Sequence, residues 1–378
     1  DQSSAASDVY KRQPYTDQME MSEKLACIRL IRTRNIGPMT YSLLMKRYGS
    51  AHEALRAIPE LARRGGRKLE PASLKLAEAE MAANEAANAT LLFRGGEGYP
   101  ERLDQFDDAP AIISVRGNQH LLARPAIAMV GARNASLNAL RHAEKLAGDL
   151  GKEGYVITSG LARGIDAATH RGALVTRTIA VIAGGIDSCY PPENSELQQM
   201  IVETGLLVAE MPPGTQPTAR HFPVRNRIIA SLALGVVVVE AAARSGSLIT
   251  AREATERGGE VMAIPGSPLD PRSSGCNILI RDGATLVQNS EDIIECLARP
   301  IKAGVPASAE WDGPAPLPGS EAEIADCRKV ILEGLGTEPT DIDDLVRWCD
   351  APTACVQAAL LELELAEIIT RHHGNRVS

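Results

Sequence analysis

Six short runs of apolar residues lie between residues 126 and 266, and helix-like segments separate them. Each run is continuous, without polar residues at alternate positions, so both faces of the corresponding strand are expected to be buried. This pattern is typical of a parallel sheet between two layers of helices, and it predicts an α/β fold with a Rossmann-like, doubly wound, mostly parallel sheet. The runs are AIAMV (126–130), YVITS (155–159), TIAVIA (178–183), LLVAE (206–210), GVVVVE (235–240) and EVMAIPG (260–266).

The segments on either side of these runs predict smaller domains. Before them, apolar residues recur at three- and four-residue spacing, with breaks at 35–38 and 49–50, which indicates a small helical domain. After them, a Pro- and Gly-rich stretch has the composition of a linker, and the last part has the pattern of a winged-helix domain with a terminal hairpin. The expected division is a disordered N-terminus (1–20), a helical domain (21–88), a Rossmann-like domain (89–298), a linker (299–320) and a winged-helix-like domain (321–378).

Charge is distributed unevenly along the chain. The formal net charge is −8, which excludes a uniformly basic surface of the histone type. Residues 25–70, however, contain ten Lys and Arg against three Asp and Glu, whereas residues 306–378 contain five against 14. The basic N-terminal region therefore fits a role in DNA binding, and equally a role in packing or dimerization. The acidic C-terminal domain is a poor candidate for binding duplex DNA and fits better as a module for contacts with proteins.

Composition excludes several other classes of protein. The seven cysteines are odd in number and form no CxxC pair, so neither a disulfide framework nor a metal site is predicted, and no cofactor is expected. No apolar run reaches the roughly 18 residues of a membrane span, and no signal pattern is present, so a cytoplasmic protein without membrane association is expected. Aromatic residues make up only 3%, too few for a broad platform on which nucleic-acid bases stack.

The loops that follow the strands carry candidate binding residues, because ligands of an open parallel sheet bind beyond the carboxyl ends of its strands. The first loop contains Gly131, Arg133 and Ser136. It lacks the dinucleotide fingerprint GxGxxG, so it offers an anion a charged side chain in place of bare backbone. A second loop contains Gly160 and Arg163, and a third spans 184–192. Each loop taken alone is also explained as an ordinary turn with a solvated arginine.

The strongest local signal lies at residues 220–227, where Pro223 fits the first turn of a helix that continues into the apolar stretch IIASLAL. Arg225 and Arg227 fall within the first turn of that helix, where the macrodipole disfavours each cation by about 0.3–1 kcal/mol. A bound phosphate would offset this cost, and Phe222 would offer one stacking surface to a base. Arg220 and Asn226 extend the same cluster. The alternative is that the phenylalanine fills the core and the arginines form surface ion pairs.

A last candidate, Ser245, Gly246 and Ser247, precedes a helix and suits anion binding at the helix N-terminus, but simple capping explains it equally well. None of these loops shows a nucleophile next to a base. The sequence therefore predicts no catalytic residue.

Several consecutive motifs together resemble the DNA-processing protein A family, known as DprA or Smf. They cover the whole predicted Rossmann-like domain, and the flanking domains also fit a three-part architecture with a helix-hairpin-helix-like or sterile-alpha-motif-like domain and a winged helix. The motifs are VGARNAS (130–136), SGLARGIDAATHRGAL (159–174), TIAVIAGGIDSCYPPEN (178–194), HFPVRNRIIASLALGVVVVEAAARSGSLITAREA (221–254) and GCNILIRDGATLV (275–287).

This resemblance implies a non-enzymatic protein that binds single-stranded DNA, protects incoming strands in natural transformation and loads the recombinase RecA. It also implies a homodimer formed through the Rossmann-like domain. The DNA-binding residues that it implies are Gly131, Arg133, Ser136, Gly160, Arg163, Arg220, Phe222, Arg225, Asn226, Arg227, Ser245, Gly246 and Ser247.

An enzymatic alternative also remains. The nucleotide phosphoribohydrolases of the LOG family carry a PGGxGTxxE signature, and residues 250–253 of this chain reproduce its final TxxE. Glu253 would then be the hydrolytic base. The PGG part of that signature is replaced here by Arg244, Ser245 and Gly246. A dinucleotide-dependent enzyme is disfavoured because GxGxxG is missing.

Overall fold

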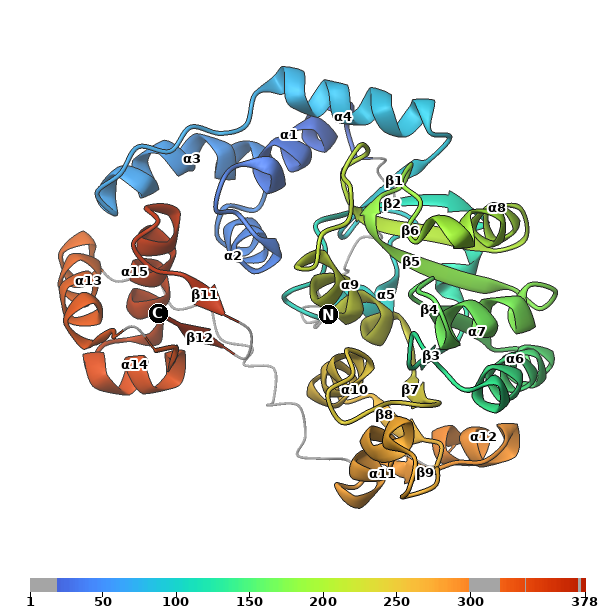
Figure 1. Ribbon diagram of the computed structural model, residues 1–378. Coiled ribbons are helices and arrows are strands. Elements are labelled where there is room, and N and C mark those ends of the chain that lie inside the picture. The colour runs from blue at the N-terminus through green and yellow to red at the C-terminus, as the bar shows by residue number, and fades with distance from the viewer. Residues whose placement is uncertain (1–18, 299–319, 337, 373–374) are drawn as a thin grey trace, which may run out of the picture.

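A nine-stranded sheet forms the centre of the computed structural model, which describes residues 19–298, 320–336, 338–372 and 375–378 (Figure 1). Its strand order is β1-β2-β6-β5-β4-β3-β7-β8-β9, and all neighbours from β6 to β9 are parallel. Only β1 and β2, at one edge, pair in antiparallel fashion. The strands are β1 (Thr90–Phe93), β2 (Ile112–Gly117), β3 (Ala126–Val130), β4 (Val156–Ser159), β5 (Thr178–Gly185), β6 (Leu206–Met211), β7 (Gly235–Val238), β8 (Glu260–Ala263) and β9 (Thr285–Leu286).

Helices cover both faces of the sheet. Alternate residues of one strand reach opposite layers: Ile127 and Met129 of β3 join the core under one layer, and Ala128 and Val130 join the core under the other. One layer consists of α6 (Leu137–Lys152), α7 (Ile165–Ala173), α8 (Ser195–Thr204) and α12 (Ser290–Ala298). The other consists of α5 (Glu101–Asp104), α9 (His221–Leu232), α10 (Ser247–Glu256) and α11 (Ser274–Arg281). The predicted α/β fold with a mostly parallel, doubly wound sheet is confirmed.

All six strands predicted from the apolar runs are present, as β3 to β8. Strands β1, β2 and β9 were not predicted. Strands β1 and β9 are edge strands of four and two residues, too short to stand out as apolar runs, whereas β2 has six residues, four of them buried, and was missed. From β3 the chain adds β4, β5 and β6 on one side, and it then returns to add β7, β8 and β9 on the other side of β3. The parallel strands β3 and β7 therefore both end at the same edge of the sheet. This edge is where ligands of such folds bind.

The N-terminal domain is helical, as predicted. Its first break is a turn in which Asn35 has a φ of +63°, and its second is Gly49, which has a φ of +76° and ends α2. The Ser50 hydroxyl then accepts the N–H of Glu53 and caps α3. The helices are α1 (Met21–Arg32), α2 (Pro38–Tyr48), α3 (Ala51–Arg64) and α4 (Leu74–Ala86).

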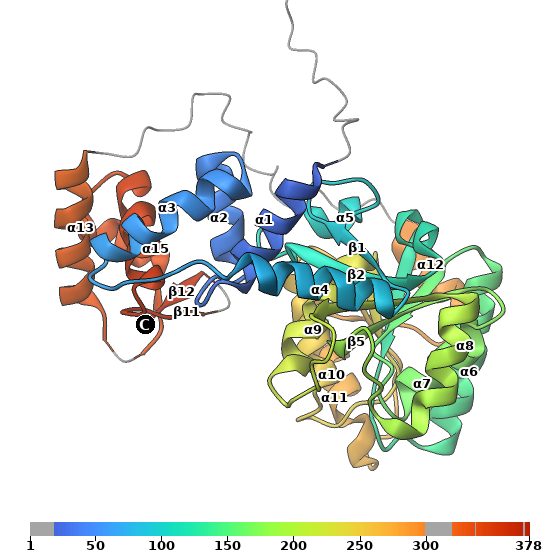
Figure 2. The same ribbon diagram turned by 90° about the horizontal axis from the view of Figure 1, so that it is seen from above.

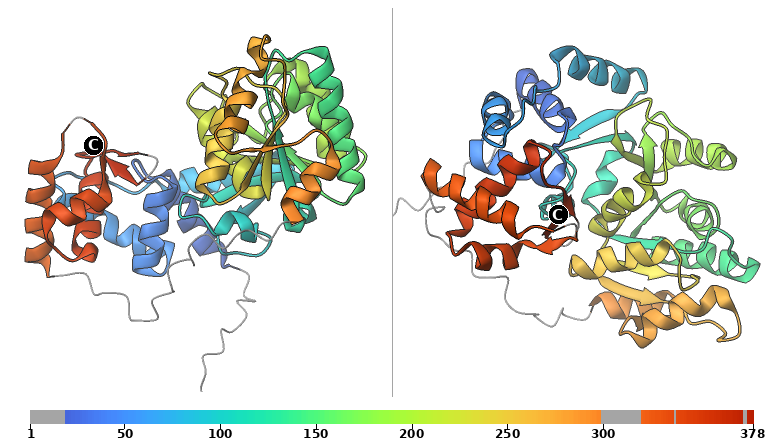
Figure 3. Two further views of the ribbon diagram at one scale, coloured as in Figure 1. Left: turned by 90° about the horizontal axis from the view of Figure 1, so that it is seen from below. Right: turned by 60° about the vertical axis from the view of Figure 1, so that its left-hand side comes forward.

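The C-terminal domain is a winged helix, as predicted, with a small antiparallel sheet in the order β10-β12-β11. It lies beside the N-terminal helices and away from the nine-stranded sheet (Figures 2 and 3). Its elements are α13 (Glu321–Gly334), β10 (Thr340–Asp341), α14 (Ile342–Cys349), α15 (Thr353–Leu365), β11 (Arg371–His372) and β12 (Arg376–Val377). The predicted disordered start and linker fall, apart from residues 19, 20 and 320, outside the described residues.

No helix in the described ranges has both the length and the apolar composition needed to cross a bilayer.

Candidate nucleic-acid interface

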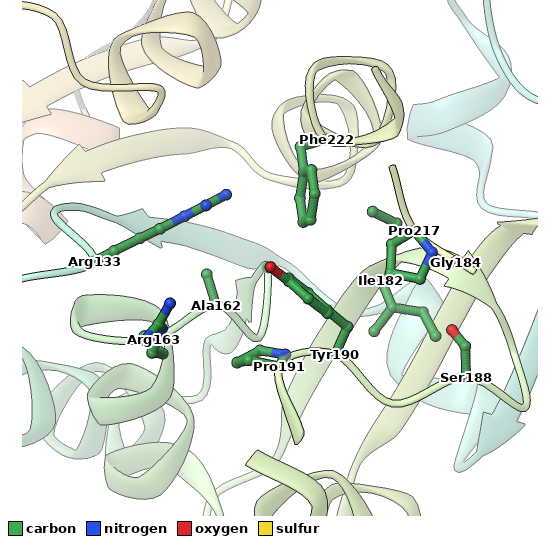
Figure 4. Close-up of a pocket in the computed structure, with 12 residues that line it drawn as sticks. Arg133, Ala162, Arg163, Ile182, Gly184, Ser188, Tyr190, Pro191, Pro217 and Phe222 are labelled. Atoms are coloured by element: carbon green, nitrogen blue, oxygen red, sulfur yellow. The ribbon is translucent and has the colours of Figure 1, made fainter. Parts of the chain in front are cut away.

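A pocket opens beyond the carboxyl ends of β3, β4 and β5, and the N-terminal turn of α9 lies over it (Figure 4). The parallel register of these strands brings their three following loops to one edge of the sheet. The pocket therefore combines side chains from loops that are far apart in the sequence. It is lined by Arg133, Gly160, Ala162, Arg163, Ile182, Ala183, Gly184, Ser188, Tyr190, Pro191, Pro217 and Phe222.

An arginine and two aromatic rings converge in this pocket (Figure 4). The guanidinium carbon of Arg133 lies 5.0 Å from the centroid of the Phe222 ring. The Tyr190 ring follows, with its centroid 5.7 Å from that of Phe222 and its plane tilted by 55°. Arg133 is exposed, and no residue of the described chain accepts a hydrogen bond from its guanidinium group. A cation–π contact at an exposed site contributes only about 0.5–1 kcal/mol, so the N–H groups of Arg133 remain available to an anion.

A second arginine borders the pocket on the side of α7. The side chain of Arg163 is 61% exposed, and its Nε lies 3.4 Å from the carboxylate of Glu193. An exposed pair of this kind contributes about 0–1 kcal/mol and is readily exchanged for a better anion. The pocket thus presents two exposed cations.

Four of the residues singled out from the sequence, Arg133, Gly160, Arg163 and Phe222, meet in this pocket. Tyr190 was not among the predicted residues, although it lies in the third glycine-containing loop, at 184–192. The signal available in the sequence was an aromatic residue within a loop that follows a buried strand, in a chain with few aromatic residues.

The guanidinium groups of Arg225 and Arg227 point into the protein and do not line the pocket. Arg225 donates hydrogen bonds from Nη1 to the carbonyl oxygens of Gly160 and Val181. Arg227 donates to the carbonyl oxygen of Asp108 and pairs with the carboxylate of Glu210. Carbonyl and carboxylate oxygens thus stabilise the positive charges of Arg225 and Arg227, which the macrodipole disfavours near the N-terminus of α9. These contacts differ from the surface ion pairs of the alternative, because Arg225 binds carbonyl oxygens and the pair of Arg227 with Glu210 is buried. The two arginines thus form a framework beneath the pocket.

The neighbours of these arginines have smaller roles. The amide oxygen of Asn226 accepts a hydrogen bond of 3.2 Å from Nε of Arg225, so Asn226 supports the same framework. Arg220 remains exposed just before α9, where its Nε lies 3.4 Å from Nε2 of His221.

Arg225 belongs to a buried polar layer under the pocket. Burial lowers its pKa to about 10, against the opposing effect of Asp166, so it stays cationic at neutral pH. Burial likewise raises the pKa of Asp166, whereas the charge of Arg225 lowers it. His170 is fully buried beside them, with its Nδ1 2.8 Å from the hydroxyl of Thr178. Burial, and then the charge of Arg225, lower the pKa of His170 to about 3.

A carboxylate from within the protein fills the anion position at the N-terminus of α6. Glu240 accepts hydrogen bonds from the backbone N–H (2.9 Å) and the hydroxyl (2.7 Å) of Ser136, and it is only 6% exposed. Glu240 follows β7, so it lies in the crevice between β3 and β7 where the sheet reverses. Gly131 is required here by close packing, because an added Cβ would lie 2.6 Å from the side chain of Ile165. Ser136 and Gly131 thus shape this crevice and do not line the pocket.

The serines at the start of α10 bond to each other. The hydroxyl groups of Ser245 and Ser247 lie 2.7 Å apart, and that of Ser245 also accepts the N–H of Ser247 at 3.4 Å. Gly246 lies between them and has no atom within 4 Å of an added Cβ. The N-cap of α10 is Gly246 and no side chain among the described residues caps this helix, so the capping alternative is not met either; none of the three residues lines the pocket.

Sequence comparison places all three parts of the chain. Residues 90–298 match the family described as DNA recombination-mediator protein A. The chain belongs to this family. Residues 21–83 match a DprA-like N-terminal HHH domain, and residues 315–375 match a DprA winged helix domain.

Relatives in the family are similar over much of their length. The chain is 38% identical over 306 residues to protein Smf of Escherichia coli, which covers 80% of this chain and 81% of that protein. It is 48% identical over 198 residues to the DNA processing protein DprA of Streptococcus pneumoniae, covering 52% of this chain and 70% of that protein.

Solved structures of family members are also similar. The X-ray structure of the Streptococcus pneumoniae protein has a TM-score of 0.63 at 36% identity, covering 72% of this chain and 97% of that one. The structure of DNA processing protein A from Helicobacter pylori, described for its single-stranded DNA binding mode, has a TM-score of 0.51 at 30% identity. It covers 55% of this chain and 95% of that one.

The residue on which the enzymatic alternative depends lies outside the pocket. Glu253 is 9% exposed, and its carboxylate pairs with Arg257. The same guanidinium group also binds Asp108 at 2.5 Å. The Glu253 carboxylate is thus engaged by Arg257 and is not among the residues that line the pocket. The geometry therefore gives the hydrolytic role of Glu253 no support.

The buried His170 predicts a specific pH dependence of stability. Its pKa is about 3 in the folded protein and 6.5 when unperturbed, so between these values the unfolded chain binds a proton that the native state excludes. Stability therefore falls as the pH drops, and the contribution of His170 to the loss between pH 7 and pH 5 is about 2 kcal/mol. Urea unfolding at both pH values, on the wild type and His170→Asn, measures this contribution as a shallower pH dependence in the variant. Equal pH dependence in both proteins would show that native His170 takes up protons.

Proposed function

We propose that this protein binds single-stranded DNA in the pocket formed by Arg133, Arg163, Tyr190 and Phe222. The observation that carries the proposal is the exposed Arg133 guanidinium above the Phe222 ring, with no hydrogen-bond acceptor among the described residues. A cation beside a ring suits a phosphate joined to a base, whatever the sequence of the strand. The related Helicobacter pylori protein, whose single-stranded DNA binding mode is described, supports this choice of ligand.

The aromatic rings of the pocket suit a single strand better than a duplex. Two rings within 5.7 Å of each other offer stacking to one or two unpaired bases, which a duplex does not expose. Arg133 and Arg163 at the rim of the pocket would contact the phosphates of the DNA strand on either side of the stacked bases. Affinity should therefore depend on salt and hardly on sequence.

A salt titration tests the role of the arginines. Binding of a labelled oligonucleotide is measured at several salt concentrations for the wild type, Arg133→Ala and the double variant Arg133→Ala with Arg163→Ala. The slope of log affinity against log salt should decrease by about 0.7 for each phosphate that the variant no longer binds. Arg124→Ala is the matched control, because Arg124 is exposed and precedes β3, at the opposite edge of the sheet. A slope that is the same in all four proteins would place the strand elsewhere.

We also propose that the protein has no catalytic activity and acts in DNA processing during natural transformation, as a homodimer that loads RecA onto the bound strand. The support for this wider role is membership of the family and the names of its members. Light scattering of the full chain measures the oligomeric state. The rate of RecA assembly on a strand already coated with single-strand binding protein, with and without this protein, measures loading. An unchanged rate would contradict the loading role and leave strand binding intact.

A further inference from the structure

The acidic C-terminal domain makes a specific contact with the basic N-terminal domain. The carboxylate of Glu367, just after α15, accepts a hydrogen bond of 2.9 Å from the side-chain amide of Asn35. It also pairs with Nε of Arg34 at 2.7 Å and with Nη1 of Arg67 at 2.6 Å. The Asn35 hydrogen bond, with the charges of Arg34 and Arg67, lowers the pKa of Glu367. Three donors from one domain thus surround a single carboxylate of another.

A second carboxylate reaches the same turn between α1 and α2. Glu364 accepts a hydrogen bond of 2.9 Å from the hydroxyl of Thr40, in the first turn of α2, and one of 3.3 Å from Nε of Arg371. We define the anion clasp as Arg34, Asn35, Thr40 and Arg67 of the N-terminal domain. Two acidic side chains therefore fill the clasp, and both belong to one short stretch of the C-terminal domain.

Apolar packing continues the contact along α3. Leu361 and Leu365 of α15 join the core of the N-terminal domain. The backbones come so close at Gly65 that an added Cβ would lie 2.2 Å from the carbonyl oxygen of Glu362. The Glu362 side chain is fully buried, pairs with Arg328 of its own domain and lies 3.9 Å from Arg64 of α3. The face of α15 that meets the N-terminal domain is thus both apolar and acidic.

In this arrangement α15 cannot enter a groove of duplex DNA. In a helix-turn-helix unit the second helix enters the major groove, and here that helix is α15. It is instead buried against α3, and its acidic side chains would repel phosphates. The clasp has the opposite character, since its two guanidinium groups, an amide and a hydroxyl are donors that bind phosphate oxygens as readily as carboxylate oxygens.

We propose that the clasp is a second binding site for the phosphate backbone of a DNA strand, and that Glu364 and Glu367 occupy it as an internal competitor. In the free protein the C-terminal domain docks on the clasp and its carboxylates engage the donors, while the side chains of Arg34 and Arg67 stay 77% and 53% exposed. A strand that binds the clasp displaces the two carboxylates, so docking and DNA binding oppose each other by the same factor. This proposal does not depend on the pocket at the sheet edge, because the clasp is built from another domain.

The test removes the two negative charges while leaving the shape of the side chains. In the full chain, Glu364→Gln with Glu367→Gln should release the C-terminal domain, seen as a larger radius of gyration in small-angle scattering. Affinity for an oligonucleotide at low salt should rise about fivefold or more, the usual lower range of coupling between two sites. The matched control is Asp326→Asn with Glu333→Gln, which removes the same charge from exposed positions of α13. It should leave both measurements unchanged.

A second pair of substitutions separates the clasp from the pocket. Adding Arg34→Ala and Arg67→Ala to the Gln variant should abolish the gain in affinity, whereas adding Arg133→Ala should lower affinity without abolishing the gain. The proposal is overturned if the Gln variant binds no better than its control, whether or not the domain is released, or if the gain survives removal of both arginines. If instead the pocket proposal were wrong, Arg133→Ala would leave the affinity for the oligonucleotide unchanged, which distinguishes the two failures.

Discussion

Replacing Arg225 by Ala should destabilise the central domain by roughly 2–6 kcal/mol, since each of two buried carbonyl oxygens loses a donor at a cost of about 1–3 kcal/mol. The guanidinium group is 6% exposed and donates to the carbonyl oxygens of Gly160 and Val181, at the ends of β4 and β5. Its removal leaves both oxygens without this donor and leaves Asp166 without the charge that lowers its pKa. The loops that build the pocket then lack a common support.

Chemical denaturation of the wild type, Arg225→Ala and Arg163→Ala measures this effect. Arg163→Ala is the control, because the exposed side chain of Arg163 should contribute within about 0.5 kcal/mol. Arg225→Lys keeps a charge but not the planar group that reaches two carbonyls, so an intermediate stability is expected. If Arg225→Ala unfolded like the wild type yet bound DNA poorly, Arg225 would contact the strand directly and the buried arrangement would be wrong.

Most of the central fold was predictable because a parallel sheet leaves a strong trace in the sequence. Strands β3 to β8 are buried on both faces, so each appears as a continuous apolar run between helical segments. Strand β1 has four residues, which change from exposed at its start to buried at its end, and β9 has two residues. Such short segments lack the length that separates a strand from a loop, so their pairing appears only in three dimensions.

The site was predictable only in part, because residue type and spacing do not reveal the direction of a side chain. Phe222 and Arg225 lie on the same helix within one turn of each other, yet Phe222 lines the pocket and Arg225 lies beneath it. Similarly, Ser136 was expected to meet an external anion. Its hydroxyl caps α6 by accepting the N–H of Ala139, and it donates to Glu240, 104 positions away in the sequence, a pairing that no local pattern indicates.

The uneven charge was visible in the sequence, but its consequence was not. The basic residues near the N-terminus were expected to serve DNA binding or, equally, packing, and the acidic residues near the C-terminus to contact proteins, but the pairing of the two was not predicted. In the structure they face each other, with Arg34 and Arg67 on Glu367 and Arg64 near the buried Glu362. Much of the basic character that favoured DNA binding is therefore neutralised within the protein. The exposed Arg133 and Arg163 at the sheet edge are left as the accessible cations of the proposed pocket.

The aromatic pair in the pocket carries the other large prediction. Replacing Phe222 by Ala should reduce affinity for single-stranded DNA by roughly tenfold, since stacking of one base on an aromatic side chain contributes about 1–3 kcal/mol. Tyr190→Ala should cause a similar loss if a second base stacks on the Tyr190 ring. Phe222→Trp, which keeps a ring over Arg133, should retain most of the affinity. Equilibrium titration of a short oligonucleotide at a fixed salt concentration measures each effect.

The chain offers a matched control for this experiment, because Phe106 makes the same kind of contact elsewhere. The guanidinium carbon of Arg257 lies 5.4 Å from the centroid of the Phe106 ring, and neither residue lines the pocket. Phe106→Ala removes an equal ring and should leave DNA affinity unchanged. Because Phe222 contributes stacking and Arg133 a phosphate contact, Phe222→Ala should lower affinity at all salt concentrations without changing the salt slope. A changed slope with unchanged affinity at high salt would mean that Phe222 only positions Arg133 and that no base stacks on the ring.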